Sequence, residues 1–147
     1  MNAFNVIRNT AAFSVLVAAG ALASPAHGAP PNVVDSDIAD NTAMGKYALA
    51  SFRSGERNTA AGAYALVDMT NASDNTAIGA AALGSTTTGA GNSAFGSHAL
   101  LSNETGAQNS ALGARTLKQN TTGTNNTATG TDAMGSNTAG NYNTSAG

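Results

Sequence analysis

The fold is decided by the stretch Asn75-Thr76-Ala77-Ile78-Gly79, because the chain rewrites this five-residue word along most of its length. Successive copies begin at a constant spacing of 17 residues and end on glycine. Their first residues are Asn41, Asn58, Asn75, Asn92, Asn109, Asn126 and Asn143. A strict period of this kind indicates a repeat protein whose units pack on their neighbours. We therefore expect a stack of seven coils, the last of them partial.

The positions within one repeat differ clearly in character when they are numbered from the asparagine as position 1. Position 2 is Thr or Ser, position 3 is almost always Ala, position 5 is always Gly, and position 9 is Leu or once Met. We expect extended segments at positions 1 to 4 and roughly 7 to 11, with turns at the glycines of position 5 and near position 15. Positions 2 and 4 then share one face of the first segment, and positions 1 and 3 share the other.

Stacking of the coils aligns equivalent residues. The asparagines are expected to form a ladder of side-chain amides, and the position-9 leucines a continuous row. Position 4 is mostly apolar and is expected to fill the coils, less well at Thr129 and Ala146, so that fraying starts at the C-terminus. A helix is disfavoured because Thr, Asn and Gly are poor helix formers.

The fold predicted from these features is all-β, a parallel β-roll or β-solenoid of 17-residue coils. One coil cannot persist alone. Burial of one Leu and one medium apolar residue contributes roughly 3–6 kcal/mol, whereas ordering 17 residues costs roughly 17–34 kcal/mol. Hydrogen bonds between coils must supply much of the rest. The stack would be only about 30 Å tall, so packing against copies of itself is expected, as a homo-oligomer.

Composition excludes several classes of function. The chain of 147 residues has 10% charged residues, no cysteine and a net charge of −2. Disulfides and Cys-ligated metals are excluded, and no basic stripe indicates nucleic-acid binding. The two histidines are His27 and His98, and His98 falls at the variable position 7, which reads as a surface site. We find no catalytic, metal-binding or cofactor-binding set, so an enzyme is not expected.

The N-terminus has the pattern of an export signal. Residues 1–28 combine one arginine with an uncharged, mostly apolar run, Ala11–Ala23, that is too short to span a bilayer. Cleavage is expected after Gly28, or else after Ala23, and the alternative is an uncleaved N-terminal anchor. The mature chain, with no second hydrophobic segment, is expected outside the cytoplasm, secreted or on the bacterial cell surface.

The remainder divides into a leader and a repeat domain. Residues 29–40 begin with two prolines and carry three aspartates, which we interpret as a solvated acidic leader before the first coil. Residues 41–147 form the repeat domain.

The word Asn-[Thr/Ser]-Ala-x-Gly, followed by Ala-Leu and a Thr-Gly or Ser-Gly turn, resembles the head repeats of trimeric autotransporter adhesins, the YadA-like heads. It is also similar to repeats of phage tail fibres. The resemblance covers residues 41–147 and implies a left-handed β-roll that forms a homotrimer, located at the outer membrane. The family's commonest head repeat is shorter than 17 residues. The chain shows neither the apolar heptads of a stalk nor membrane strands, so it is expected to derive from a larger reading frame or to be secreted without an anchor.

The resemblance implies a binding module that attaches to host matrix proteins or cells. The alternatives are a purely structural fibre or spacer segment and, because of the Thr/Ser file at position 2, an ice-binding solenoid. Tyr and Arg are enriched in binding hot spots. The candidate contact residues are Tyr47, Tyr64, Arg53, Arg57 and Arg115.

Overall fold

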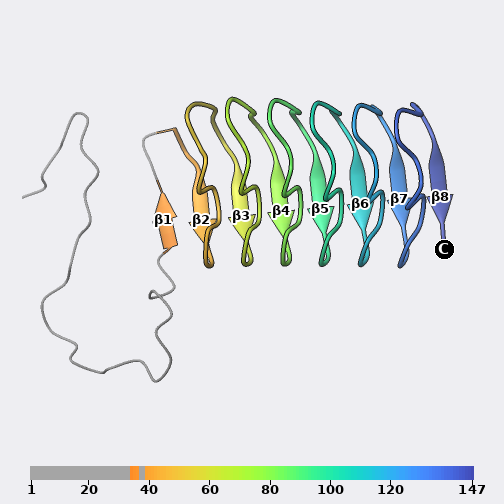
Figure 1. Ribbon diagram of the computed structural model, residues 1–147, viewed down its shortest axis with the longest axis horizontal. Coiled ribbons are helices and arrows are strands. Elements are labelled where there is room, and N and C mark those ends of the chain that lie inside the picture. Colours follow the sequence, from red (N-terminus) through yellow and green to blue (C-terminus); the bar gives the residue numbers. More distant parts are fainter. Residues whose placement is uncertain (1–33, 37–38) are drawn as a thin grey trace, which may run out of the picture.

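The computed structural model describes residues 34–36 and 39–147 as a stack of coils with one short strand in each (Figure 1). The predicted export signal, residues 1–28, lies outside the described residues. The strands are β1 (Val34–Ser36), β2 (Thr42–Met44), β3 (Thr59–Ala61), β4 (Thr76–Ile78), β5 (Ser93–Phe95), β6 (Ser110–Leu112), β7 (Thr127–Thr129) and β8 (Thr144–Ala146). They form one sheet in sequence order, and the described part of the chain contains no helix.

The register repeats the sequence period. From β2 to β8 the strands pair in parallel, and each residue lies opposite the residue 17 places further on, as Ala77 does opposite Ala94. The predicted parallel β-solenoid with 17-residue coils is therefore confirmed. The left-handed winding and the trimer implied by the resemblance stay predictions.

The N-terminal end of the sheet is closed by the leader. β1 pairs with β2 in the antiparallel sense, with Asp35 opposite Ala43. This strand occupies the hydrogen-bonding edge that β2 would otherwise present for pairing with another chain. The leader that we interpreted as a solvated acidic segment thus contributes a strand to the sheet.

The second extended segment predicted at positions 7 to 11 is absent, and that prediction is wrong. These residues form consecutive turns. The backbone has positive φ at positions 7, 9 and 17 of every complete coil, as at Ala81 (54°), Leu83 (51°) and Asp74 (61°). Left-handed residues change the chain direction sharply at each of these points. Three such residues in every coil close a 17-residue circuit that has only one strand.

The asparagine ladder is confirmed, and it is fully bonded in the middle of the stack. Asn92 Nδ2 donates to Asn75 Oδ1 at 3.1 Å and to the carbonyl oxygen of Gly106 at 2.9 Å. Asn92 Oδ1 accepts from the backbone N and from Nδ2 of Asn109, at 3.0 and 3.1 Å. The side chain thus makes four hydrogen bonds while fully buried, which satisfies its donors and its acceptor.

The core beside the ladder is thin and built from small residues. Position 3 contributes buried alanines, and position 9 contributes the row of Leu66, Leu83, Leu100 and Leu117. Position 4 is not part of this core. Ile78 is 42% exposed and Leu112 is 55% exposed, because positions 2 and 4 face outward when the asparagines and alanines face inward. The expectation that position 4 fills the coils is wrong, and the fraying argument drawn from it loses its basis.

A second amide ladder at position 12 was not expected from the sequence. Asn120 Nδ2 donates to Asn103 Oδ1, and Asn137 Nδ2 donates to Asn120 Oδ1, both at 2.8 Å. Toward the N-terminus the file changes to Thr86 and then Met69, both fully buried. Thr86 Oγ1 has no hydrogen-bond partner among the described residues. The polar ladder therefore ends at a buried hydroxyl without a partner.

Replacement of this hydroxyl by a methyl group in Thr86→Val is expected to stabilise the protein by about 1 kcal/mol, because an unpaired buried polar group carries a desolvation penalty of roughly that size or more. Chemical denaturation followed by circular dichroism measures the change. Thr88→Val, at an exposed position of the same coil, is the matched control and should change stability by less than about 0.5 kcal/mol. A loss of stability in Thr86→Val would contradict the conclusion that the Thr86 hydroxyl has no hydrogen-bond partner.

Candidate interaction surfaces

The outer face of the sheet, which we call the outer sheet face, consists of the residues at positions 2 and 4 of β2 to β8. Its position-4 file contains the exposed apolar side chains Met44, Ile78, Phe95 and Leu112. The neighbouring position-2 file is Thr or Ser, and neither file contains a charged residue. A shallow hollow of about 390 Å³ lies on this face over β5 to β7. The structure therefore has a strip of mostly apolar, exposed side chains beside a hydroxyl strip that is half-buried at β2 to β5 and exposed at β6 to β8.

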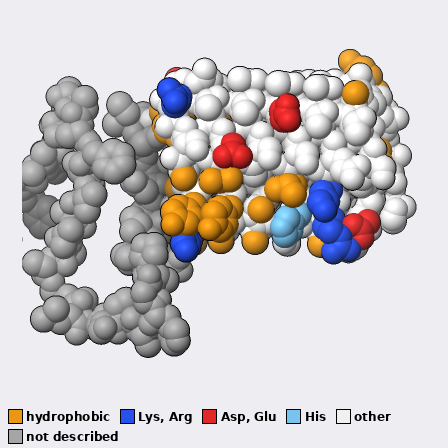
Figure 2. Space-filling view, viewed as in Figure 1, with side chains coloured by type: hydrophobic (Ala, Val, Ile, Leu, Met, Phe, Trp, Pro, Cys, Tyr) orange, Lys and Arg blue, Asp and Glu red, His pale blue; other side chains and the backbone are white. Residues whose placement is uncertain are grey.

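A second surface, which we call the edge stripe, is formed by the residues at positions 7 and 10, which lie in the turns that follow each strand. Figure 2 shows hydrophobic side chains at one end of this stripe, followed by the histidine and then by basic side chains. Its larger residues are Tyr47, Tyr64, Val67, His98, Leu101, Arg115, Lys118 and, in the last complete coil, the carboxylate Asp132. The stripe thus changes from aromatic to basic along the stack.

The aromatic end contains a tyrosine pair. The ring centroids of Tyr47 and Tyr64 are 5.1 Å apart, with an interplanar angle of 41°. The two residues are 51% and 45% exposed. Lys46 Nζ lies 4.9 Å from the centre of the Tyr47 ring, within the range of a cation–π contact. The pair forms an exposed, tilted aromatic platform at one end of the stripe.

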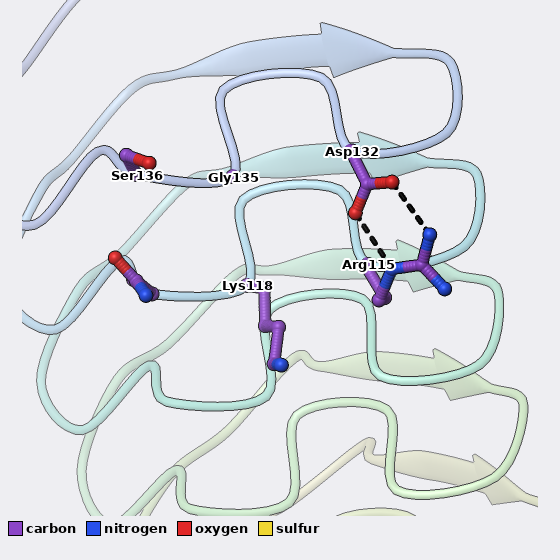
Figure 3. A pocket seen from close by; sticks show the side chains of 6 residues that line it. Arg115, Lys118, Asp132, Gly135 and Ser136 are labelled. Carbon is purple, nitrogen blue, oxygen red and sulfur yellow. Dashed lines mark hydrogen bonds and ion pairs between the residues drawn. The ribbon is translucent and has the colours of Figure 1, made fainter.

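The basic end is organised by an ion pair between neighbouring coils. Arg115 donates from Nε and from a terminal nitrogen to the two carboxylate oxygens of Asp132, both at 2.6 Å (Figure 3). The hydrogen bond from the guanidinium holds the pKa of Asp132 below its usual value. Arg115 and Asp132 border a hollow of about 300 Å³. Lys118 lines the same hollow, together with Gln119, Gly135 and Ser136. Lys118 makes no ion pair with the described residues.

The five candidate contact residues do not form one surface. Tyr47, Tyr64 and Arg115 share the edge stripe, whereas Arg53 and Arg57 lie at positions 13 and 17. Arg57 is already paired, since it donates to both carboxylate oxygens of Asp74 and to Glu56. The hydrogen bond from Arg57 lowers the pKa of Asp74, so this arginine contributes to contacts between coils.

Members of both surfaces were not predicted from the sequence. Lys118 falls at position 10, which also contains Ala, Val, Gly and Leu and therefore has no recognisable type. The exposure of Phe95 and its neighbours was missed because apolar residues were assigned to the interior. His98 is exposed, as predicted, and its Nδ1 lies 2.8 Å from Ser97 Oγ.

The described residues contain no group of His, Cys, Asp and Glu that could hold a metal ion. No helix among them is long and apolar enough to cross a membrane. The chemistry present at both surfaces is that of contact: apolar side chains, aromatic rings, hydroxyls and fixed charges.

Comparisons of the chain with protein-family models, curated proteins and solved structures return no match.

Proposed function

We propose that residues 41–147 act as a self-associating binding module of the adhesin-head kind, outside the cytoplasm, in which copies of the chain bury the outer sheet face against one another. The observation that carries the proposal is the apolar file on an uncharged sheet face. Side chains such as Phe95 and Leu112 are 40% and 55% exposed there. The export signal predicted from the sequence supports the location, and the resemblance of the repeats supports the trimer and the binding role.

The chemistry of this face favours a second copy of the same chain as its partner. Two uncharged faces do not repel each other electrostatically when two copies of the chain meet. The side chains of the apolar file have the same spacing of about 4.8 Å in both copies. Hydroxyls at position 2 can exchange hydrogen bonds with partners or retain water. In an oligomer of this kind the edge stripe stays outside the interface and remains available for a ligand.

The size of the face sets the expected strength of association. Seven strands of three residues cover about 10 Å by 30 Å, or about 300 Å². The apolar file is about half of this face, and the whole face is below the roughly 800 Å² per partner of a standard interface. We therefore expect assembly that is reversible and depends on protein concentration.

Phe95→Glu is expected to shift the assembled protein to the monomer, because it places a charge in the middle of the apolar file, where burial in an interface would leave it unpaired. Sedimentation velocity over a range of concentrations measures the change. Thr105→Glu, which adds the same charge at an exposed position 14 away from the sheet, is the matched control and should assemble like the unmodified chain. A monomer at every concentration for the unmodified chain, or equal assembly of both variants, would count against self-association through this face.

The binding role is tested separately, with the full chain exported and purified from the medium or cell surface. We expect it to bind immobilised host cells or matrix proteins above an albumin-coated control, and the assembled form to bind more tightly than Phe95→Glu through avidity. Absence of binding by the assembled form would remove the adhesin role and leave the structural alternative.

A structural spacer is the second candidate, and the uniformity of the coils favours it. Each coil repeats the same register, so deletion of one 17-residue unit, residues 75–91, should rejoin equivalent backbone and shorten the particle by about 5 Å. A spacer would retain its activity in this deletion variant.

A further inference from the structure

We propose that the edge stripe is a binding surface for a linear anionic polysaccharide. This inference deepens the proposed binding role by naming the ligand class and the residues, and it rests on that role only for its biological setting. The stripe contains the Tyr47–Tyr64 pair at one end, where Figure 2 shows hydrophobic side chains, and basic side chains with one carboxylate at the other end. Figure 3 shows the turns of the basic end in front of the strands.

The tyrosine pair serves no evident need of the fold. Among the described residues the fully buried apolar core consists of Ala, Leu and Met, and the aromatic ring that packs against it is that of Phe52, not of a tyrosine. Position 7 requires a left-handed backbone, with φ of 61° at both Tyr47 and Tyr64, and a bulky residue is unfavourable in that region. Ala81 occupies the same position in the next coil, so the site accepts a small residue. Two exposed tyrosines at strained positions are better explained by contact with a ligand.

The aromatic platform suits a sugar ring. The C–H groups of one face of a pyranose are apolar and slightly positive, and they stack on the negative face of an aromatic ring. Tyr47 and Tyr64 offer two such rings, 5.1 Å apart, and their phenol groups can hydrogen-bond sugar hydroxyls. Lys46, near the Tyr47 ring, adds a cation that can reach an acidic substituent.

The basic end suits the anionic groups of the same polymer. Lys118 makes no ion pair with the described part of the chain. Arg115 is held in place by Asp132, which also neutralises it. His98 uses Nδ1 for Ser97, and its Nε2 makes no hydrogen bond to the described residues. Two exposed carboxylates lie at or beside the stripe, Asp68 next to the aromatic end and Asp132 in its pair with Arg115. The ligand's anionic groups are therefore expected over His98 and Lys118, which make no ion pair with the described residues.

The geometry of the stripe favours an extended polymer. Coils stack about 4.8 Å apart, which places Lys118 about 14 Å along the stack from Tyr64 and makes the whole stripe about 24 Å long. An extended chain of several sugars can follow a straight surface of this length.

The test titrates the exported full chain with oligomers of polygalacturonate, using dextran oligomers of equal length as the neutral probe. The unmodified protein should bind polygalacturonate at least about tenfold more tightly than dextran. Tyr64→Asn should weaken binding at least about tenfold, as expected for the loss of an aromatic hot spot. Asn adopts the left-handed region readily, so this change should leave the fold intact. Lys118→Gln should weaken polygalacturonate binding severalfold, leave dextran binding unchanged and reduce the dependence on salt.

The matched control is Tyr142→Asn, because Tyr142 is 80% exposed and has positive φ but lies at position 17, away from the stripe. It should bind like the unmodified protein. The proposal is overturned by no binding of polygalacturonate, by unaltered binding in Tyr64→Asn, or by equal loss in the control. It is also overturned if a matrix protein binds through Tyr64 while polygalacturonate does not. Phe95→Glu separates the two proposals, since a monomer should retain the affinity of one stripe even where self-association fails.

Discussion

Asn92→Asp is expected to lower the free energy of unfolding by about 3–5 kcal/mol at pH 7, because it places a carboxylate where the ladder requires an amide. Asn92 Nδ2 donates to Asn75 Oδ1 and to the carbonyl oxygen of Gly106. In the Asp variant a carboxylate oxygen replaces Nδ2 and has no proton to donate to these two acceptor oxygens. Its other oxygen can still accept from Asn109, but this does not offset a buried charge surrounded by uncharged groups.

The loss should depend on pH in a defined direction. The carboxyl of this variant has an unfolded pKa of about 3.9, and burial without a cation raises the folded pKa above that value. Protonation restores one donor. The destabilisation relative to the unmodified chain is therefore smallest below about pH 4 and grows by about 1.4 kcal/mol per pH unit until the pH reaches the folded pKa.

Urea denaturation of both proteins at pH 4 and pH 7 measures this difference. Asn71→Asp is the matched control, since Asn71 is exposed and accepts a hydrogen bond from Ser54; its effect should be small at both pH values. Equal destabilisation of Asn92→Asp at both pH values would show that shape, and not the missing donor, decides the outcome.

The features that sequence alone predicted are those in which one residue type recurs at one position. Asn at position 1 and Leu at position 9 recur because each contacts its own copy in the next coil. Stacking therefore converts the period directly into a ladder and a row. The parallel register follows from the same constraint, since any slip would separate Asn75 from Asn92 and leave buried amides unpaired.

The features that were missed depend on backbone geometry that these residue types do not reveal. Leu83 and Ala81 have positive φ, although neither residue favours that region. Their identity therefore predicted an extended segment where the chain turns. The second ladder was missed because position 12 changes from Phe52 and Met69 to Asn103 along the chain, so that no single residue type marks it.

The candidate surfaces were predictable only in part, for a related reason. Tyr47, Tyr64 and Arg115 fall at the same repeat position, so stacking alone places them in one file. Arg57 and Asp74 are 17 residues apart, so stacking of the coils places them side by side, where they form an ion pair. The sequence alone did not reveal this pair, because it does not show that position 17 lies on an exposed edge. The outward direction of position 4 required knowing that the asparagine side chains face inward.

Gly96→Ala is expected to destabilise the protein by more than about 4 kcal/mol, a large effect for a single methyl group. Gly96 has φ of +143°, in a region essentially restricted to glycine. A Cβ there would contact the carbonyl oxygen of Gly113 and lie 2.6 Å from its carbonyl carbon. Both atoms belong to the backbone of the next coil, so no side chain can move aside, and relief would require separating the two coils.

Gly91 provides a comparison at a tolerant position, because its φ of +68° is in the ordinary left-handed region and a Cβ there would have only ordinary contact, 3.6 Å from Gln108 Cγ. Position 17 already accepts residues such as Asn125 with φ of 57°. Gly91→Ala should therefore cost only about 1 kcal/mol, from the left-handed backbone, and Gly91→Asn still less. Thermal and urea unfolding of these variants measure the difference. A similar, small loss in Gly96→Ala and Gly91→Ala would contradict the conclusion that position 5 requires glycine. The expected order, with Gly96→Ala far more damaging, would agree with both reasons for glycine at position 5: its backbone φ and the close stacking of the coils, which leaves no room for a side chain.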